Sequence, residues 1–193
     1  MLYRSEANHS RDCAQYPYES IPARIFLDTN VVNALVKHAA HIFEHEPLPY
    51  GLHQTLAHDI EALMHVFQIG SRAYWELVAS AKTLEEISQT PTDDLRETLM
   101  DYAVEIAECS GEAAGFAQDL GRRIIGSDFL DMLPDRNDRE LLAHAIGLEC
   151  DVSCTCDRST IVRRRDRLPA LPIRVLTPVE WWQHVKPWAG LWC

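Results

Sequence analysis

The chain has 193 residues, of which 47% are hydrophobic and 24% are charged, and its formal net charge is −11 at pH 7. A chain of this size and composition buries a substantial core, which favours one folded domain over several. The apolar runs are too short to cross a bilayer, and the negative charge disfavours a protein that grips nucleic acid non-specifically.

Residues 1–22 are polar and show no hydrophobic periodicity, so we predict a loosely ordered arm followed by a single domain over 23–193. The N-terminus lacks the apolar stretch of a signal peptide, so we expect a soluble, cytoplasmic protein without a membrane partner. The six cysteines show no recurring CxxC pair, which favours reduced thiols over a zinc ribbon or redox motif.

Strands and helices alternate after the arm. The apolar run at 24–27 predicts a strand, and the helical spacing from Val31 to Val36 predicts a helix behind it. A helix at about 52–68, a strand at 73–79 and a short helix at 83–88 follow. Thr92 is placed to cap a long helix, and a helical region punctuated by glycines extends from 111 to 126.

The last third of the chain continues the alternation. Asn137 and Glu140 fit a capping box that opens a helix, and strands are predicted at 151–155 and 173–176. Thr177, Pro178 and Glu180 have the spacing that begins a final helix. This order predicts an α/β fold with three α/β/α layers around a central parallel sheet.

Four acids fall where predicted strands and helices meet: Asp28, Glu86, Asp138 and Asp157. In an open parallel sheet, ligands bind beyond the carboxyl ends of the strands, so these acids are expected to converge. Two carboxylates about 4 Å apart repel by roughly 4 kcal/mol at an effective dielectric constant of about 20, so such a cluster requires a cation. Oxygen ligands suit Mg²⁺ or Mn²⁺, and phosphodiester hydrolysis is the chemistry that such a site supports.

Each acid also has a simpler interpretation. Asp138 and Asp157 lie at predicted helix starts, where aspartate is common as a cap. Glu85 is an alternative to Glu86, and Asp135 is an alternative to Asp138 because three residues separate them at a helix entry. Asp28 is harder to explain without a partner, since it directly follows a buried apolar run.

Three segments together resemble the PIN domain family of metal-dependent nucleases, which have a Rossmann-like α/β/α fold. IFLDTNVVNAL is similar to the opening strand with its Asp-Thr-Asn signature, LVASAKTLEEI to the second segment, and PDRNDRELLAHAIGLECDVSCTCDRS to the C-terminal half. The resemblance spans about residues 23–180. It implies that Asp28, Glu86, Asp138 and Asp157 are the catalytic metal ligands and that Asn30 and Thr155 support them.

The resemblance further implies cleavage of single-stranded RNA by metal-bound water, with Mg²⁺ or Mn²⁺ as cofactor. Many bacterial relatives are toxins of toxin–antitoxin pairs, silenced by a small inhibitory partner protein, and many form homodimers. A basic stretch near the C-terminus is predicted to hold RNA phosphates through Arg158, Arg163, Arg164 and Arg165. The alternative is a catalytically inactive PIN-like RNA-binding or regulatory module, suggested by the net charge.

Two further features fall outside the family pattern. A helical insertion is predicted at about 40–72, and the histidine-rich segment that leads into it carries His38, His41 and His45 at helical spacing. We interpret these histidines as a polar helix face, with a transition-metal site as the alternative. The C-terminal tail is rich in tryptophan, which indicates core packing or a contact with a partner: Trp181, Trp182, Trp188 and Trp192.

Overall fold

The computed structural model describes residues 3–70, 73, 75–108 and 114–190. Its centre is a four-stranded sheet in the order β2-β1-β3-β4, in which every neighbouring pair of strands is parallel. The strands are β1 (Arg24–Leu27), β2 (Glu76–Val78), β3 (Val152–Cys154) and β4 (Arg174–Leu176). The predicted α/β class and parallel sheet are confirmed.

Helices cover both faces of this sheet. Successive side chains of a strand point to opposite faces, so Ile25 and Leu27 of β1 enter one core and Phe26 enters another. The first core is completed by α2 (Thr29–Lys37), α4 (Gln54–Gly70), α6 (Asp93–Glu108) and α9 (Pro178–Val185). The second is completed largely by α8 (Arg136–Gly147).

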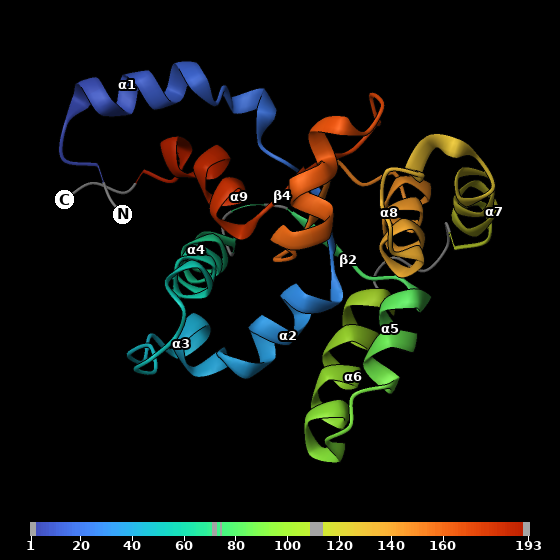
Figure 1. The fold of residues 1–193 in the computed structure, drawn as a ribbon. Helices are drawn as coiled ribbons and strands as arrows, with labels where there is room; N and C mark the ends of the chain where they lie inside the picture. Colours follow the sequence, from blue (N-terminus) through green and yellow to red (C-terminus); the bar gives the residue numbers. More distant parts are fainter. Residues whose placement is uncertain (1–2, 71–72, 74, 109–113, 191–193) are drawn as a thin grey trace.

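The other helices extend these two layers. In Figure 1, α5 (Ala81–Ser88) lies beside α6, and α7 (Ala114–Ile125) lies beside α8. The helix predicted after Thr92 is therefore confirmed as α6, and part of the glycine-punctuated region is α7; Gly111 lies outside the described residues. Over the described part of the chain, no helix combines the length and apolarity needed to cross a bilayer.

The segment predicted to be a loosely ordered arm instead contains a helix, α1 (Glu6–Gln15), followed by a short 3₁₀ turn. No residue of α1 is buried, and polar contacts attach it to the C-terminal segment. His9 Nε2 donates to the carbonyl oxygen of Pro187 at 2.8 Å, and Trp188 Nε1 donates to that of Tyr16 at 2.9 Å. The helix has no apolar stripe, so periodicity alone does not predict it.

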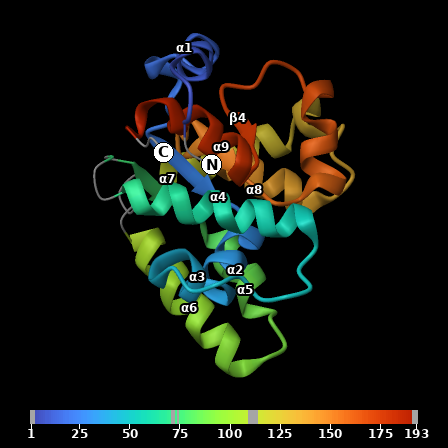
Figure 2. The ribbon, with the colours of Figure 1, turned by 90° about the vertical axis from the view of Figure 1, so that its left-hand side faces the viewer.

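The predicted insertion at 40–72 is helical, but it is part of the core. It forms α3 (Ala39–Glu44) and α4, and Ile60, Leu63 and Val66 of α4 are fully buried. Figure 2 shows α4 crossing the molecule beside α9. Trp181 and Trp182 of α9 are buried there, which confirms core packing for these two; Trp192 lies outside the described residues.

The predicted cap is found at the start of α9 but not at the start of α8. Thr177 and Glu180 form the predicted capping box of α9, with Pro178 in the first turn. The capping box predicted from Asn137 to Glu140 is wrong, because α8 begins earlier and Asp135 caps it by accepting from the Asn137 amide at 2.8 Å. Asp138 consequently lies in the first turn of α8, and its side chain is not the cap.

Candidate functional site

The strand order places a switch point beside β1. The chain passes from β1 to β2 on one side of β1, then returns to β3 on the other side. In open parallel sheets, a crevice forms at such a point beyond the carboxyl ends of the two strands, and ligands bind there. Asp28 directly follows β1, and Thr155, Cys156 and Asp157 directly follow β3.

Asp28 is held at this switch point by two neighbouring donors. The Thr155 hydroxyl donates to Asp28 Oδ2 at 2.5 Å, and Asn30 Nδ2 donates to the same oxygen at 2.6 Å. Asp28 is only 5% exposed, and Thr155 is fully buried. Because both bonds end on Oδ2, the other carboxylate oxygen, Oδ1, is left for a ligand.

Asn30 and Thr155 also tie the ends of β1 and β3 together. Asn30 Oδ1 accepts from the Cys156 amide at 2.7 Å, and Thr155 Oγ1 accepts from the Asp157 amide at 3.0 Å. These bonds fix the side chains of both residues, so the orientation of Asp28 is set before any ligand arrives. These hydrogen bonds are the contacts expected of the supporting role predicted for Asn30 and Thr155, which stays a prediction.

Burial raises the pKa of Asp28 to about 6, from an ordinary value of 3.8. The hydrogen bonds from Thr155 and Asn30 lower it, but the nearby charges of Glu86 and Asp138 raise it further. A carboxylate in this environment is costly when ionised. A cation at the crevice would remove that cost, which makes Asp28 a suitable ligand.

Glu86 is the glutamate that faces the end of β1. The Thr29 hydroxyl donates to Glu86 Oε2 at 2.6 Å, which joins α5 to the first residue of α2. Glu85 is exposed, and its carboxylate lies 3.2 Å from Lys82 Nζ on its own helix. Of the two glutamates that the sequence leaves open, the structure brings Glu86 toward Asp28.

Asp138 and Asp157 meet at one hydroxyl group. Thr160 Oγ1 lies 2.7 Å from Asp138 Oδ2 and is also within hydrogen-bond distance of Asp157 Oδ2. A hydroxyl carries one proton, so it donates to only one of two carboxylates at a time. The contact to which it does not donate is favourable when that carboxyl group carries a proton.

The pKa shifts of these two acids have opposite directions. Burial raises the pKa of Asp138, and the charges of Asp135, Asp157 and Glu86 raise it further, against the hydrogen bond from Thr160. For Asp157, burial is outweighed by the hydrogen bonds from Thr160 and Ser159, so its pKa is lowered. Asp157 Oδ1 accepts from the amides of Ser159 and Thr160 and so caps the π-helical turn Arg158–Val162.

Asp28, Glu86, Asp138 and Asp157 thus form a chain of mutually repelling charges around the switch point of the sheet. Their donor atoms are all carboxylate oxygens, the ligand type that Mg²⁺ and Mn²⁺ prefer. As the side chains stand, however, no group of three or more acids, histidines or cysteines among the described residues is arranged to hold a metal ion. Hydroxyl groups of Thr29, Thr155 and Thr160 lie against the carboxylates instead.

The predicted RNA-binding arginines have different surroundings. Arg158 makes a bidentate ion pair with Asp59 of α4. Asp59 is only 1% exposed. Arg165 does the same with Glu180, at 2.7 and 2.5 Å. Arg164 donates to the Met132 carbonyl at 3.0 Å, and Arg163 is exposed. Two of the four arginines are therefore occupied by protein carboxylates.

Thr155 was predicted from the sequence, but the hydroxyl groups of Thr29 and Thr160 and the carboxylate of Asp59 were missed. Asp59 had a usable signal, since it is an acid inside the apolar stripe of α4 and needs a cation when buried. Thr29 is the central residue of the Asp-Thr-Asn signature, so its proximity to the site was available. Thr160 carried no signal, because its position depends on the π-helical turn after β3.

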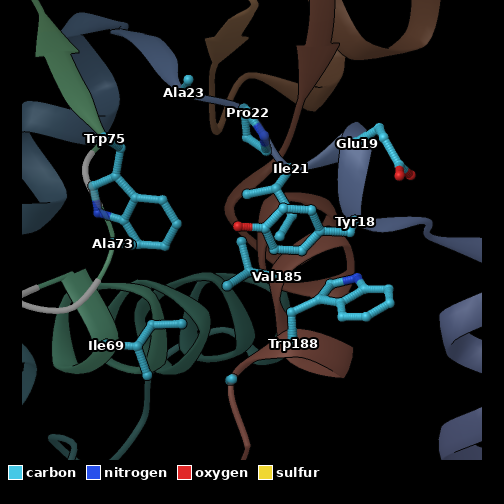
Figure 3. Close-up of a pocket in the computed structure, with 11 residues that line it drawn as sticks. Tyr18, Glu19, Ile21, Pro22, Ala23, Ile69, Ala73, Trp75, Val185 and Trp188 are labelled. Carbon is cyan, nitrogen blue, oxygen red and sulfur yellow. The ribbon is translucent and has the colours of Figure 1, made fainter.

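A separate cavity of about 520 Å³ lies at the opposite, amino end of β1 and β2. Figure 3 shows Trp75, Tyr18 and Trp188 on its walls, with Ile21 and Val185 between them. Among the lining residues that the structure describes, Glu19 is the only one with a carboxylate, and it is exposed. The described walls of this cavity are largely apolar, whereas the four predicted acids lie elsewhere, so the candidate site is the acid cluster beyond the carboxyl ends of β1 and β3.

The remaining candidates of the sequence do not form sites in the described part of the chain. His38, His41 and His45 join no metal-binding group there, and the His41 ring contacts the Glu46 carbonyl instead. Cys13, Cys150, Cys154 and Cys156 are free thiols, whereas Cys109 and Cys193 lie outside the described residues. Comparisons of the chain with protein-family models, curated proteins and solved structures found no match.

Proposed function

We propose that this protein is a Mg²⁺- or Mn²⁺-dependent endoribonuclease with a three-layer, Rossmann-like PIN fold. The observation that carries the proposal is the position of Asp28. It is a buried carboxylate at the switch point of a parallel sheet, its pKa is raised to about 6, and the charges of Glu86 and Asp138 surround it. Such an arrangement is unfavourable in isolation and becomes favourable around a divalent cation.

The proposed ligands are Asp28, Glu86, Asp138 and Asp157. A bound ion would acidify a water molecule and offset the negative charge that develops on a phosphodiester. Asn30 and Thr155 keep Asp28 oriented through their bonds to Oδ2. Thr29 and Thr160 hold Glu86 and the Asp138–Asp157 pair in the same way.

Arg163 and Arg164 would bind RNA phosphates, since Arg158 and Arg165 already form ion pairs with protein carboxylates. A net charge of −11 makes this local positive charge important, because the rest of the surface repels a polyanion. A small inhibitory partner and a homodimer, as the family resemblance implies, belong to the same proposal.

The test is cleavage of fluorescently labelled single-stranded RNA with Mg²⁺ or Mn²⁺. The proposal predicts cleavage that EDTA abolishes and that falls by at least about a thousandfold in Asp28→Asn and Glu86→Gln, as expected for loss of a group that stabilises the transition state. Glu85→Gln is the matched control, since Glu85 is exposed and pairs with Lys82, and it is expected to keep wild-type activity. Full activity in Asp28→Asn would refute the assignment, provided that circular dichroism shows both proteins folded.

A second candidate is a PIN-like module that binds RNA and does not cut it. The observation in its favour is that no metal-holding group is formed by the side chains as they stand in the described residues. Under this function, Arg163→Glu weakens RNA binding, and Asp28→Asn leaves RNA binding and the lack of cleavage unchanged.

A further inference from the structure

A buried lysine lies between the two helices that carry Glu86 and Asp138. Lys82 of α5 is only 8% exposed. Its Nζ lies 3.3 Å from Glu140 Oε2 of α8 and 3.2 Å from Glu85 Oε1 of its own helix. A buried ammonium group requires such partners, because an unpaired one is strongly disfavoured.

The position of this ion pair relates it to the acidic crevice. Lys82 precedes Glu86 by one helical turn, and Glu140 follows Asp138 by two residues. The Lys82–Glu140 pair therefore connects α5 to α8 within a turn of both acids, at a point where the two helices are in contact.

Glu140 has two cationic neighbours, Lys82 on α5 and Arg136 on its own helix. Arg136 contacts Glu140 at 2.9 Å from an exposed position on α8 itself, so it does not connect the helices.

We propose that Lys82 is a positioning residue for the metal site: through Glu140 it sets the separation of Glu86 and Asp138. The inference rests on the proposed function. Lys82 is not assigned to phosphate binding, because two protein carboxylates already occupy its ammonium group. Partners that orient metal ligands typically contribute tenfold to a hundredfold to metal affinity.

The experiment measures Mn²⁺ affinity by calorimetry and thermal stability for the wild type and a variant set. Lys82→Met is expected to weaken Mn²⁺ binding by about tenfold or more, and Lys82→Arg to restore it to within a few-fold of wild type. The double variant Lys82→Met/Glu140→Gln removes both charges, so it leaves no buried ion unpaired even if Lys82→Met alone fails to fold. It is expected to show the same weakened Mn²⁺ binding.

Arg136→Met is the matched control, because it removes the other cation on Glu140 without separating α5 from α8. It is expected to bind Mn²⁺ as the wild type does. Wild-type affinity in a folded Lys82→Met or double variant, with only a lower melting temperature, would show that the pair is merely structural and overturn the inference alone. Absence of Mn²⁺ binding by the wild type would overturn the proposed function, and the inference with it.

Discussion

Asp28 lowers the stability of the folded protein when its carboxyl group is ionised. Its pKa of about 6 lies above the ordinary value of 3.8 because burial disfavours the charged form. The folded protein therefore binds a proton more tightly than the unfolded chain does between these two values. Stability contributed by this group is fully present below about pH 4 and is lost as pH rises toward 6.

Because ionised Asp28 destabilises the fold, Asp28→Asn is expected to stabilise the metal-free protein at high pH. Above pH 6 the wild type carries a penalty of about 3 kcal/mol from this group, estimated as the pKa difference times about 1.4 kcal/mol per unit. The asparagine carbonyl still accepts from Thr155 and Asn30, so the variant is expected to melt at a higher temperature than wild type at pH 8. The difference is expected to vanish near pH 4. Thermal unfolding with EDTA at both values measures this, and a less stable variant at pH 8 would contradict it.

The sequence predicted four site acids and left two of them, Glu86 and Asp138, with a neighbouring acid as an alternative. Glu85 and Glu86 are adjacent on one short helix, and only the Thr29 hydroxyl bond and the Lys82 ion pair separate their roles. Asp135 and Asp138 are distinguished by the cap of α8, which depends on where the helix begins. Such distinctions follow from tertiary contacts, which local spacing does not contain.

At the scale of the elements, α4 supports the loop that follows Asp157. Arg158 comes directly after that acid and makes its bidentate pair with Asp59 on α4. Asp59 is 1% exposed, whereas the Arg158 side chain is 35% exposed. Removal of Arg158 therefore leaves a buried carboxylate unpaired, whereas removal of the Asp59 charge leaves a guanidinium group that reaches water.

Arg158→Met is expected to destabilise the protein by about 3 to 5 kcal/mol, because it leaves the Asp59 carboxylate buried without its cation. Asp59→Asn is expected to cost clearly less, since the remaining guanidinium reaches water. Urea unfolding at pH 7.5 measures both losses. The two single variants form a matched pair, and an equal or larger loss in Asp59→Asn would show that Asp59 does not depend on Arg158.

The elements themselves were predictable wherever the apolar pattern is regular. β1, α2 and α9 follow their sequence signals closely, including the Thr177 cap. The helix α1 was not predictable, because polar contacts to Pro187 and Trp188 hold it and no apolar face marks it. Strand order was also beyond the sequence, since it depends on which strands pair across long intervals.

For the whole molecule, the proposed site is acidic and the chain that carries it has a net charge of −11. A bound divalent ion would offset part of the negative charge at the crevice, where Asp28, Glu86 and Asp138 repel one another. The negative surface elsewhere disfavours non-specific RNA binding, so under the proposed function we expect a narrow range of RNA substrates and not general nuclease activity.

The most direct measurement is a calorimetric titration with Mn²⁺ at pH 7.5 of the wild type and Asp28→Asn. We expect saturable binding by the wild type and a loss of at least about a hundredfold in affinity in the variant, because a carboxylate ligand is replaced by a neutral amide. Repeating the wild-type titration at pH 5 is expected to give weaker binding, since a proton then competes for Asp28. Equal Mn²⁺ binding by the two proteins, or none by either, would contradict the assignment of Asp28 as a metal ligand.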